Sequence, residues 1–365
     1  MKILYLIPKL NCSGGVAKII TTKANFLSAD LNHEVAIVTQ NKGNEPLFFE
    51  LNSNIKLFDV ILKGNFLNFI ISYKKKIQTI LNEFKPDLIV IADNGLKALL
   101  FTHIIKTKIP IVLEIHCSKF VSEKENASIY SKIIHHLIVM IRGFGIKKFK
   151  NILMLSEESK KEWNLKNAKI IPNPVSQNNL FSDLNSKKIL CVTRNSYEKG
   201  LDRIIPISKA IQDKHPDWSF EVFCDENGAF EINEMIKINH LTNVKIQKPT
   251  KQINEAYLKS SIFISTSRFE VFPLVILEAM SFGLPIVAYD CQIGVKSVLN
   301  RDFSFLIEDG NQFEFIKRLE TLISNKELQV EMGKKGQLES LKYNHETILN
   351  QYKDYLNEVV YSEHK

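Results

Sequence analysis

Short apolar runs recur along the chain, and most are followed by a longer stretch in which apolar and polar positions have helical spacing. Five runs lie in the first half, at residues 3–7, 34–39, 87–91, 110–115 and 151–155, and five in the second, at 188–192, 220–223, 244–246, 262–265 and 286–289. Such runs, separated by helices, are typical of buried parallel strands. The pattern therefore predicts two doubly wound α/β sheets, one in each half.

The two series are separated by the segment Ile170-Ile171-Pro172-Asn173-Pro174-Val175. Two prolines two residues apart disfavour helix and hold the backbone extended, so we expect the linker between two domains here. A chain of 365 residues with 45% hydrophobic content is long enough to bury two cores of ordinary size. The predicted domains are residues 1–172 and 173–344, and the chain after Asn311 is predicted to be helical.

The segment 261–290 carries two carboxylates on one strand–helix–strand unit. Its helix, 274–280, follows Pro273 and ends at Gly283, as expected from the preference for Pro at a helix start and Gly just past its end. Ligands of open α/β sheets bind beyond the carboxyl ends of strands, where amides at a helix start attract anions. We therefore expect a phosphate near residues 268–275, with Glu270 and Glu278 placed to bind hydroxyl groups. This combination describes a sugar nucleotide.

The residues around these carboxylates resemble a known signature. Seven residues separate Glu270 from Glu278, and Ala279-Met280 and Gly283-Leu284-Pro285 follow, which resembles the E-x7-E motif of retaining glycosyltransferases of family 4 (glycosyl transferases group 1). The resemblance implies the GT-B fold, in which two Rossmann-like doubly wound domains face each other across a cleft. It further implies an acceptor-binding first domain, a nucleotide-sugar-binding second domain, and a C-terminal helix, 345–365, that crosses back to the first. One residue departs from the family, since Val271 stands where glycine is usual.

Two cations follow the first strand of the second series. Arg194 and Lys199 lie in the loop after residues 188–192, at a strand's carboxyl end. Fixed positive charges in such a place suit a diphosphate that gains negative charge as it leaves. The alternative is a loop salt bridge with Glu198. In the resemblance, Arg and Lys five residues apart before a glycine match the family's diphosphate-binding pair.

The first half offers fewer motifs. Gly14 and Gly15 follow the first strand in a turn that a ligand is able to approach closely, but the G-x-G-x-x-G fingerprint of dinucleotide sites is missing. His116 ends the strand at 110–115, where a lone histidine is usually structural, although the family often has a histidine there that contacts the donor sugar. The resemblance thus implies the catalytic residues His116, Arg194, Lys199 and Glu270 and the donor-binding residues Gly14, Gly15, Phe272, Leu274, Val275 and Glu278.

Composition and short motifs limit the expected cellular location and the expected cofactors. The apolar runs fall short of the roughly 20 residues that a spanning helix needs, and the start of the chain predicts a buried strand better than a signal peptide. Five scattered cysteines without a C-x-x-C pair indicate a reducing compartment and no zinc site, so we expect a cytoplasmic protein. No D-x-D motif is present, and neither a metal nor a cofactor is expected.

Positive charge is concentrated in the first half of the chain. Residues 1–172 hold 25 Lys and Arg against 14 Asp and Glu, a net +11, whereas the remainder holds 23 against 26, a net −3. Such asymmetry is typical of a protein that faces phosphate or acidic lipid. The stretch 132–150 mixes cations with large apolar residues, and it predicts either an interfacial amphipathic helix at an anionic membrane or a solvated helix face over a core. No nucleic-acid-binding motif accompanies these cations.

The sequence thus predicts a retaining, metal-independent glycosyltransferase. It would move a hexose or N-acetylhexosamine from a nucleotide sugar, with UDP-sugar as the expected donor, to a saccharide or lipid-linked acceptor in cell-surface polysaccharide or lipopolysaccharide biosynthesis. Two alternatives remain open. A GT-B sugar-nucleotide epimerase or hydrolase would share the nucleotide site and need no acceptor, and a non-catalytic GT-B-like binding protein would keep the two sheets alone.

Overall fold

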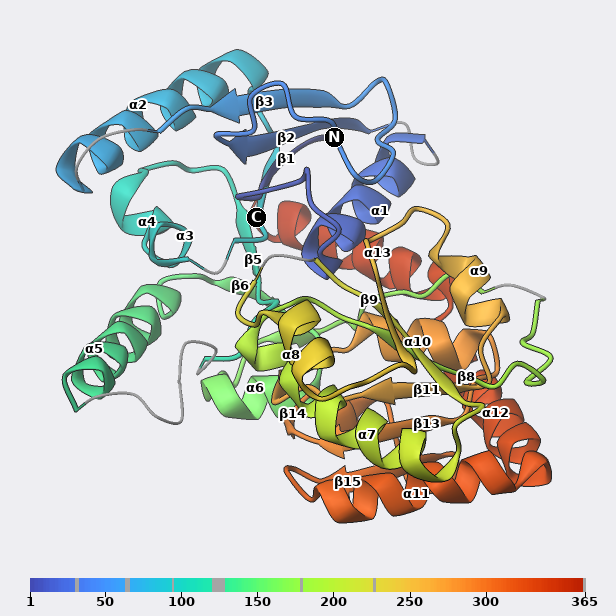
Figure 1. The fold of residues 1–365 in the computed structure, drawn as a ribbon. Helices are drawn as coiled ribbons and strands as arrows, with labels where there is room; N and C mark the ends of the chain where they lie inside the picture. Colours follow the sequence, from blue (N-terminus) through green and yellow to red (C-terminus); the bar gives the residue numbers. More distant parts are fainter. Residues whose placement is uncertain are drawn as a thin grey trace. The chain divides into compact units, whose positions relative to one another are not determined.

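The computed structural model describes residues 1–29, 33–62, 66–93, 95–119, 129–177, 180–225 and 228–363. Contacts divide the chain into two compact units (Figure 1). Unit 1 comprises Met1–Pro172 and Glu346–Lys365, and unit 2 comprises Asn173–His345. The division after Pro172 falls inside the proline-containing segment that the sequence marks as a linker.

Unit 1 is built on a parallel sheet, and in the part of the chain that the structure describes it has seven strands in the order β3-β2-β1-β4-β5-β6-β7. The strands are β1 (Lys2–Leu6), β2 (Glu34–Gln40), β3 (Lys56–Val60), β4 (Leu88–Ile91), β5 (Ile111–Glu114), β6 (Asn151–Met154) and β7 (Lys169–Ile170). The order reverses between β1 and β4, as in a doubly wound sheet.

Helices cover both faces of this sheet. They are α1 (Gly15–Ala29), α2 (Phe66–Phe84), α3 (Leu96–Leu99), α4 (Phe101–Ile104), α5 (Ile129–Ile146), α6 (Glu157–Trp163) and α13 (His345–Glu363). Figure 1 shows α2, α3, α4 and α5 on one face and α1 and α13 on the other. The first face forms one apolar core with alternate residues of the strands, such as Leu4, Ile89 and Leu113. The C-terminal helix α13 therefore belongs to the unit that begins the chain.

Unit 2 repeats the plan with a parallel sheet in the order β10-β9-β8-β11-β13-β15. Its strands are β8 (Lys188–Val192), β9 (Ser219–Phe223), β10 (Val244–Gln247), β11 (Ile262–Ser265), β13 (Ile286–Asp290) and β15 (Ser304–Glu308), and β12 (Phe269–Glu270) pairs separately with β14 (Gln292–Ile293). Its helices are α7 (Ile204–Lys214), α8 (Ile232–Ile238), α9 (Ile253–Leu258), α10 (Leu274–Ser281), α11 (Gln312–Ser324) and α12 (Lys326–Ser340), with 3-10 turns η1 (Tyr197–Lys199), η2 (Leu201–Arg203), η3 (Val295–Ser297) and η4 (Leu341–Tyr343).

The predicted architecture of two parallel-sheet α/β domains is confirmed. Five of the described strands lie outside the predicted runs, namely β3, β7 and β15 of the two large sheets and the short pair β12 and β14. Ile170 is the end of β7 rather than part of a free linker. The helix expected over 132–150 ends at Ile146, because a turn then brings Phe149 into the core before β6 begins. None of the helices that the structure describes is both long and apolar enough to cross a membrane.

Candidate functional site

The strongest cluster of predicted residues lies at the carboxyl edge of the unit 2 sheet. Strand order reverses between β8 and β11, which are hydrogen-bonded neighbours running in parallel. Their carboxyl ends therefore lie side by side, and the loops that leave them diverge to opposite sides. Such a switch point is where ligands bind in open α/β sheets. Lys199 lies in η1 after β8, and Glu270 lies in the short strand β12 that follows β11.

Lys199 and Glu270 are in direct contact. The Lys199 Nζ atom donates a hydrogen bond to Glu270 Oε1 at 2.6 Å, and Ser267 Oγ donates to the same oxygen at 2.8 Å. The Glu270 side chain is 7% exposed and that of Lys199 is 20% exposed. The structure thus joins two residues 71 positions apart into a charge pair in which the lysine side chain is partly exposed.

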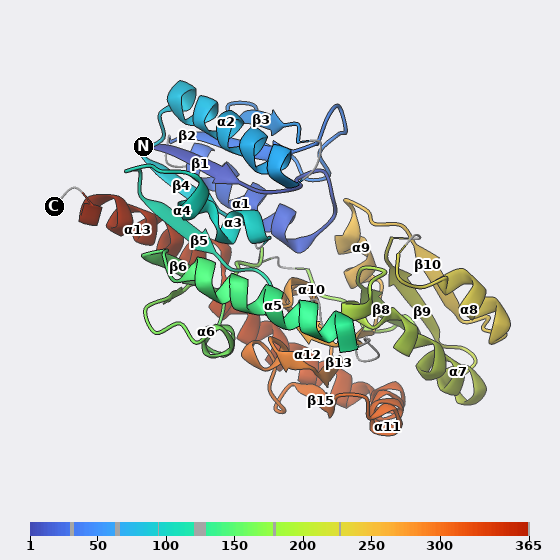
Figure 2. The same cartoon turned by 90° about the vertical axis from the view of Figure 1, so that its left-hand side faces the viewer.

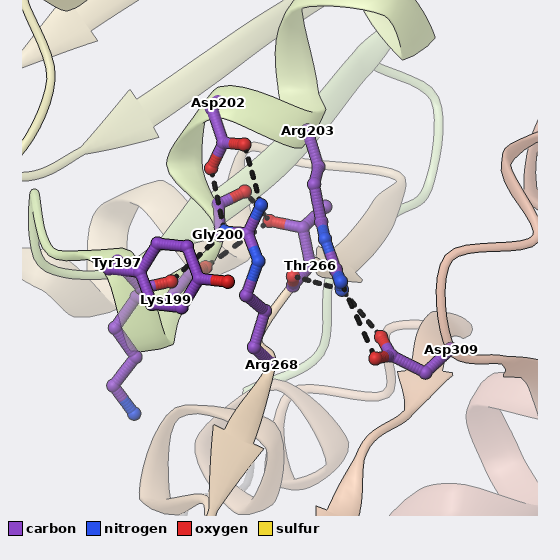
Figure 3. A network of polar contacts seen from close by, with 8 residues as sticks. All are labelled: Tyr197, Lys199, Gly200, Asp202, Arg203, Thr266, Arg268 and Asp309. Carbon is purple, nitrogen blue, oxygen red and sulfur yellow. Dashed lines mark hydrogen bonds and ion pairs between the residues drawn. The ribbon is translucent and has the colours of Figure 1, made fainter. Parts of the chain in front are cut away.

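A network of polar contacts holds the Lys199 loop in place (Figure 3). The Arg268 guanidinium makes two hydrogen bonds to the Asp202 carboxylate, at 2.8 and 2.7 Å, and donates a third to the Tyr197 carbonyl oxygen at 3.0 Å. It also stacks over the Tyr197 ring, 4.3 Å from the ring centre. Figure 3 shows the Lys199 side chain pointing away from this network. The network therefore fixes the backbone on either side of Lys199 and leaves its ammonium for Glu270.

Gly200 is required where this loop meets the backbone that follows β11. Its φ of +61° lies in the left-handed region, and a Cβ atom there would lie 2.2 Å from the Thr266 carbonyl oxygen. Nearby, Arg203 bonds the Asp309 carboxylate at 2.5 Å and the same Thr266 oxygen at 3.4 Å (Figure 3). Only glycine allows this close backbone approach.

Arg194, the other predicted cation of this loop, is placed differently. Its Nη2 atom lies 3.5 Å from Glu198 Oε1, and 53% of its side chain is exposed. A long, exposed ion pair of this kind contributes little to stability. The contact with Glu198 that the sequence offered as an alternative is therefore present, and the diphosphate role of Arg194 stays a prediction.

The second carboxylate lies one turn inside α10. Tyr257 donates a hydrogen bond from its hydroxyl to Glu278 Oε2 at 2.8 Å. Burial first, and then the negative charge of Glu278, raise the pKa of the Tyr257 hydroxyl well above its usual value, so that it remains a donor. Helix α10 begins at Leu274 after Pro273, and Val275 follows, both half-buried. The first amides of a helix have no acceptor within it.

Two residues next to Glu270 bear on how closely a ligand is able to approach. The Val271 side chain is buried, and Phe272 is also buried with its ring against that of Tyr343, 5.7 Å between centres. Close backbone approach occurs instead at Gly294, whose amide donates to the Glu270 carbonyl oxygen at 2.7 Å. A Cβ at Gly294 would lie 2.4 Å from the Val271 carbonyl carbon.

In unit 1, Gly14 and Gly15 lie where β1 passes into α1, and Gly15 is the first residue of that helix. The Gly14 carbonyl oxygen accepts a hydrogen bond from the Lys18 amide at 3.1 Å. Gly15 is exposed. The glycines thus form the predicted strand-to-helix turn, and their contact with a donor stays a prediction.

His116 is part of a buried polar cluster. Its Nε2 atom lies 3.0 Å from Glu114 Oε2, and the same oxygen accepts a hydrogen bond from Lys23 Nζ at 2.7 Å. The other carboxylate oxygen accepts from the Tyr352 hydroxyl at 2.6 Å, and that hydroxyl lies 2.9 Å from the hydroxyl of Tyr5. The cluster joins β1, α1, β5 and α13 around one carboxylate.

Charge explains how this carboxylate is tolerated. Burial by itself would raise the pKa of Glu114, but the Lys23 ammonium and the bond to His116 outweigh it and lower the pKa to about 2. Burial lowers the pKa of Lys23 below its usual value, although Glu114 opposes that shift. Glu114 is therefore ionised at neutral pH and fixes one ring nitrogen of His116.

Sequence reasoning did not single out Glu114, Lys23, Tyr352 or the Arg268–Asp202 pair. The signals were present for the first two, since Glu114 interrupts an apolar strand and Lys23 falls at an apolar position of a helix. Charged residues in such places are rarely buried unless they are paired. No sequence pattern names the partner, because Tyr352 is 238 residues away from Glu114.

A hollow in unit 1 opens at the carboxyl ends of β1, β2 and β4. Pro8, Gln40 and Tyr73 line it, together with Asp93 and Lys97. Lys97 Nζ lies 2.5 Å from Asp93 Oδ2. Burial first, and then Asp93, raise the pKa of the Tyr73 hydroxyl. The hollow has a volume of about 20 Å³, which is room for about one water molecule.

The described ranges contain no candidate metal centre. Nowhere within them do three His, Cys, Asp or Glu residues gather in a group that would hold a metal ion.

Comparisons with family models and with curated relatives agree on one family. The model "Glycosyltransferase Family 4" matches residues 13–178, and the model "Glycosyl transferases group 1" matches residues 174–339. An uncharacterized glycosyltransferase of Haemophilus influenzae is 27% identical over 97% of this chain and 99% of its own length. The amylovoran biosynthesis glycosyltransferase AmsD of Erwinia amylovora is 26% identical over 98% of this chain and 99% of its own.

A solved structure shares the fold. It is a variant of S. aureus TarM in complex with Fondaparinux, alpha-GlcNAc-glycerol and UDP, which superposes with a TM-score of 0.79 at 16% identity over 98% of this chain and 99% of that one. The two family models and the two relatives support the sequence-based identification of a family 4 (group 1) glycosyltransferase, whereas the retaining mechanism and the role of the E-x7-E motif stay predictions.

Proposed function

We propose that this chain, which belongs to the family 4 (group 1) glycosyltransferases, moves a hexosyl or N-acetylhexosaminyl group from a nucleoside diphosphate sugar to a hydroxyl acceptor with retention of configuration. UDP-sugar is the donor we expect, and the UDP bound in the TarM complex supports this choice. The proposal includes no metal and no cofactor.

The observation that carries the proposal is the Lys199–Glu270 pair at the switch point of unit 2. Its glutamate side chain is buried and its lysine side chain is partly exposed. A diphosphate bound beside Lys199 would take over its positive charge, and Glu270 would then be able to accept hydrogen bonds from sugar hydroxyls. Glu278, held by Tyr257 one turn along α10, would bind the ribose hydroxyls. The amides of Leu274 and Val275 would face the phosphate.

The chemistry follows from this placement. The bond between the anomeric carbon and the phosphate oxygen breaks, and the nucleoside diphosphate leaves with the electron pair. Lys199, Arg194 and the first amides of α10 stabilise the charge that develops on it. The acceptor hydroxyl attacks from the same face and passes its proton to a phosphate oxygen. The new bond therefore keeps the anomeric configuration, and no protein nucleophile takes part.

We assign the acceptor to unit 1. This assignment follows the resemblance to the family, in which the first domain binds the acceptor. His116 would contact the donor sugar, with its ring oriented by Glu114. The name of the Erwinia relative supports a role in polysaccharide biosynthesis.

Glu270→Ala tests the assignment. Transfer from UDP-sugars should fall about 100- to 1000-fold because the contact to the donor sugar is lost, whereas the melting temperature should fall by only a few degrees. Glu255→Ala is the matched control, since Glu255 also pairs with a lysine of unit 2 but is exposed, and its loss should leave turnover unchanged. Near-normal turnover in the Glu270 variant would overturn the assignment.

Product analysis separates this proposal from its two alternatives. A transferase gives a new glycoside only when acceptor is present, whereas an epimerase or hydrolase consumes the UDP-sugar alone. A non-catalytic binding protein would bind UDP without turnover. Lys199→Met should weaken UDP binding in calorimetry, and unchanged affinity would remove Lys199 from the diphosphate site.

A further inference from the structure

Helix α5 carries a row of large apolar side chains that face solvent. They follow steps of three and four residues, so they lie along one side of the helix. The exposed fractions are 74% for Tyr130, 62% for Ile133, 41% for Ile134, 55% for Leu137, 61% for Met140 and 61% for Phe144. We call these six residues the α5 stripe. Burying them in an apolar environment would be favourable, and nothing described in unit 1 does so.

The helix is anchored to the unit by its other side. Val139 and Ile146 are buried, and a Cβ at Gly145 would lie 2.6 Å from the Leu99 carbonyl oxygen of α3. Arg142 donates a hydrogen bond to the Lys119 carbonyl oxygen at 3.2 Å. In Figure 2, α5 lies nearest the viewer, with no other described element of unit 1 in front of it. The stripe is therefore presented outward on a fixed helix.

Along α5 and the four residues that follow it, the charge has one sign. Residues 129–150 include no Asp or Glu, and they hold the cations Lys132, Arg142, Lys147, Lys148 and Lys150. Lys147 and Lys148 follow the helix end directly and are exposed. Across unit 1 as a whole, 27 Lys and Arg face 18 Asp and Glu, a net +9, whereas unit 2 has 21 against 22, a net −1.

We propose that the α5 stripe docks on the surface of a bilayer that contains anionic phospholipid. An apolar row on a helix with an acid-free, cationic flank combines the two attractions that hold peripheral helices in the interface, namely apolar burial and attraction to acidic headgroups. A second copy of this chain would place the same cations against one another. The inference does not depend on the proposed function, because docking requires neither donor nor acceptor.

Vesicle co-sedimentation of the full chain tests the proposal. The protein should sediment with vesicles of phosphatidylglycerol and phosphatidylcholine in equal parts, remain in solution with phosphatidylcholine alone, and dissociate as NaCl rises from about 0.05 to about 0.5 M. Equal binding to both kinds of vesicle would contradict the proposed attraction to anionic headgroups. No binding to either would overturn the proposal.

Two sets of variants locate the contact. Leu137→Ser, Met140→Ser and Phe144→Ser combined should lower the partition coefficient about tenfold or more. The control is Ile238→Ser, Phe313→Ser and Leu338→Ser, which removes three exposed apolar side chains from unit 2 and should leave binding unchanged. Because all six side chains are exposed, neither set should disturb the fold.

The charge variants separate position from net charge. Lys147→Glu with Lys148→Glu should also lower binding about tenfold or more. Lys74→Glu with Lys75→Glu makes the same change of charge on the exposed side of α2 and should have a much smaller effect. Equal effects would overturn the assignment to α5. Sedimentation velocity completes the test, since a dimer that the stripe variants convert to monomer, without vesicle binding, would make the stripe an interface between copies.

Discussion

Each unit contains a close lysine–glutamate pair near the carboxyl edge of its sheet, and the two pairs differ in exposure. Lys23 and Glu114 of unit 1 have side chains 1% and 0% exposed, and the carboxylate is surrounded by Lys23, His116 and Tyr352. In the Lys199–Glu270 pair the lysine is 20% exposed. The first pair is sealed, whereas the lysine side chain of the second pair is partly exposed.

This difference teaches how similar chemistry serves two purposes. Charges removed completely from water must be paired, and losing one partner leaves the other unsatisfied. Removing either partner of the Lys23–Glu114 pair should therefore destabilise unit 1. A lysine that still reaches water is able to exchange its partner for an anionic ligand at little cost. We therefore expect substitutions in the first pair to act on folding and those in the second to act on catalysis.

Glu114→Gln should have the largest effect on stability. It leaves the Lys23 ammonium buried without a charged partner, which should lower the free energy of unfolding of unit 1 by about 3–5 kcal/mol. Urea denaturation followed by circular dichroism measures this loss. Glu34→Gln is the control, because Glu34 pairs with Lys2 and Lys56 at the surface and its loss should cost about 1 kcal/mol or less. Equal losses in the two variants would contradict the contrast between sealed and exposed pairs.

The pH dependence of folding stability should report the ionisation of the same Glu114 carboxylate. The pKa of Glu114 is about 2 in the folded protein and near 4.5 when unfolded, so between these values the unfolded chain binds the extra proton. The stability that ionised Glu114 contributes should be complete above about pH 4.5 and lost as the pH falls through about 2. The stability difference between wild type and Glu114→Gln, measured at a series of pH values, should therefore shrink over this window. A difference that does not change with pH would argue against an ionised Glu114.

Gly200→Ala should have a smaller effect on stability and should disturb the Lys199–Glu270 pair. A left-handed φ costs a residue with a Cβ about 1–2 kcal/mol, and the Thr266 carbonyl oxygen would in addition be displaced. The shifted loop should carry Lys199 away from Glu270 and weaken UDP binding in calorimetry. Gly310→Ala is the matched control, since its φ is +80° with nothing within 4 Å, so it should lower stability without changing UDP affinity. An equal loss of UDP affinity in both variants would show that the Lys199 loop has no specific part in UDP binding.

The sequence predicted what lies on regular patterns. Strands β8 and β11 have the predicted bounds, and their neighbouring carboxyl ends account for the shared location of Lys199 and Glu270. Strand β3 was missed because its residues alternate and most are exposed at the edge of the sheet, so no apolar run marks them. The dominant pairing of Glu114 with Lys23 and Tyr352 was also missed, because long-range contacts between buried polar groups leave no periodic trace.

The return of α13 to unit 1 has a consequence for how the protein is made. Lys23 and Glu114 are synthesised before unit 2, but Tyr352, whose hydroxyl bonds Glu114 and whose ring lies 4.1 Å from the Lys23 ammonium, is synthesised after it. Domains generally fold as units during synthesis. Unit 2 is therefore complete before unit 1, even though unit 1 begins the chain. Until α13 emerges, the nascent unit 1 exposes an unfinished sheet face, which is the stage at which chaperones would bind it.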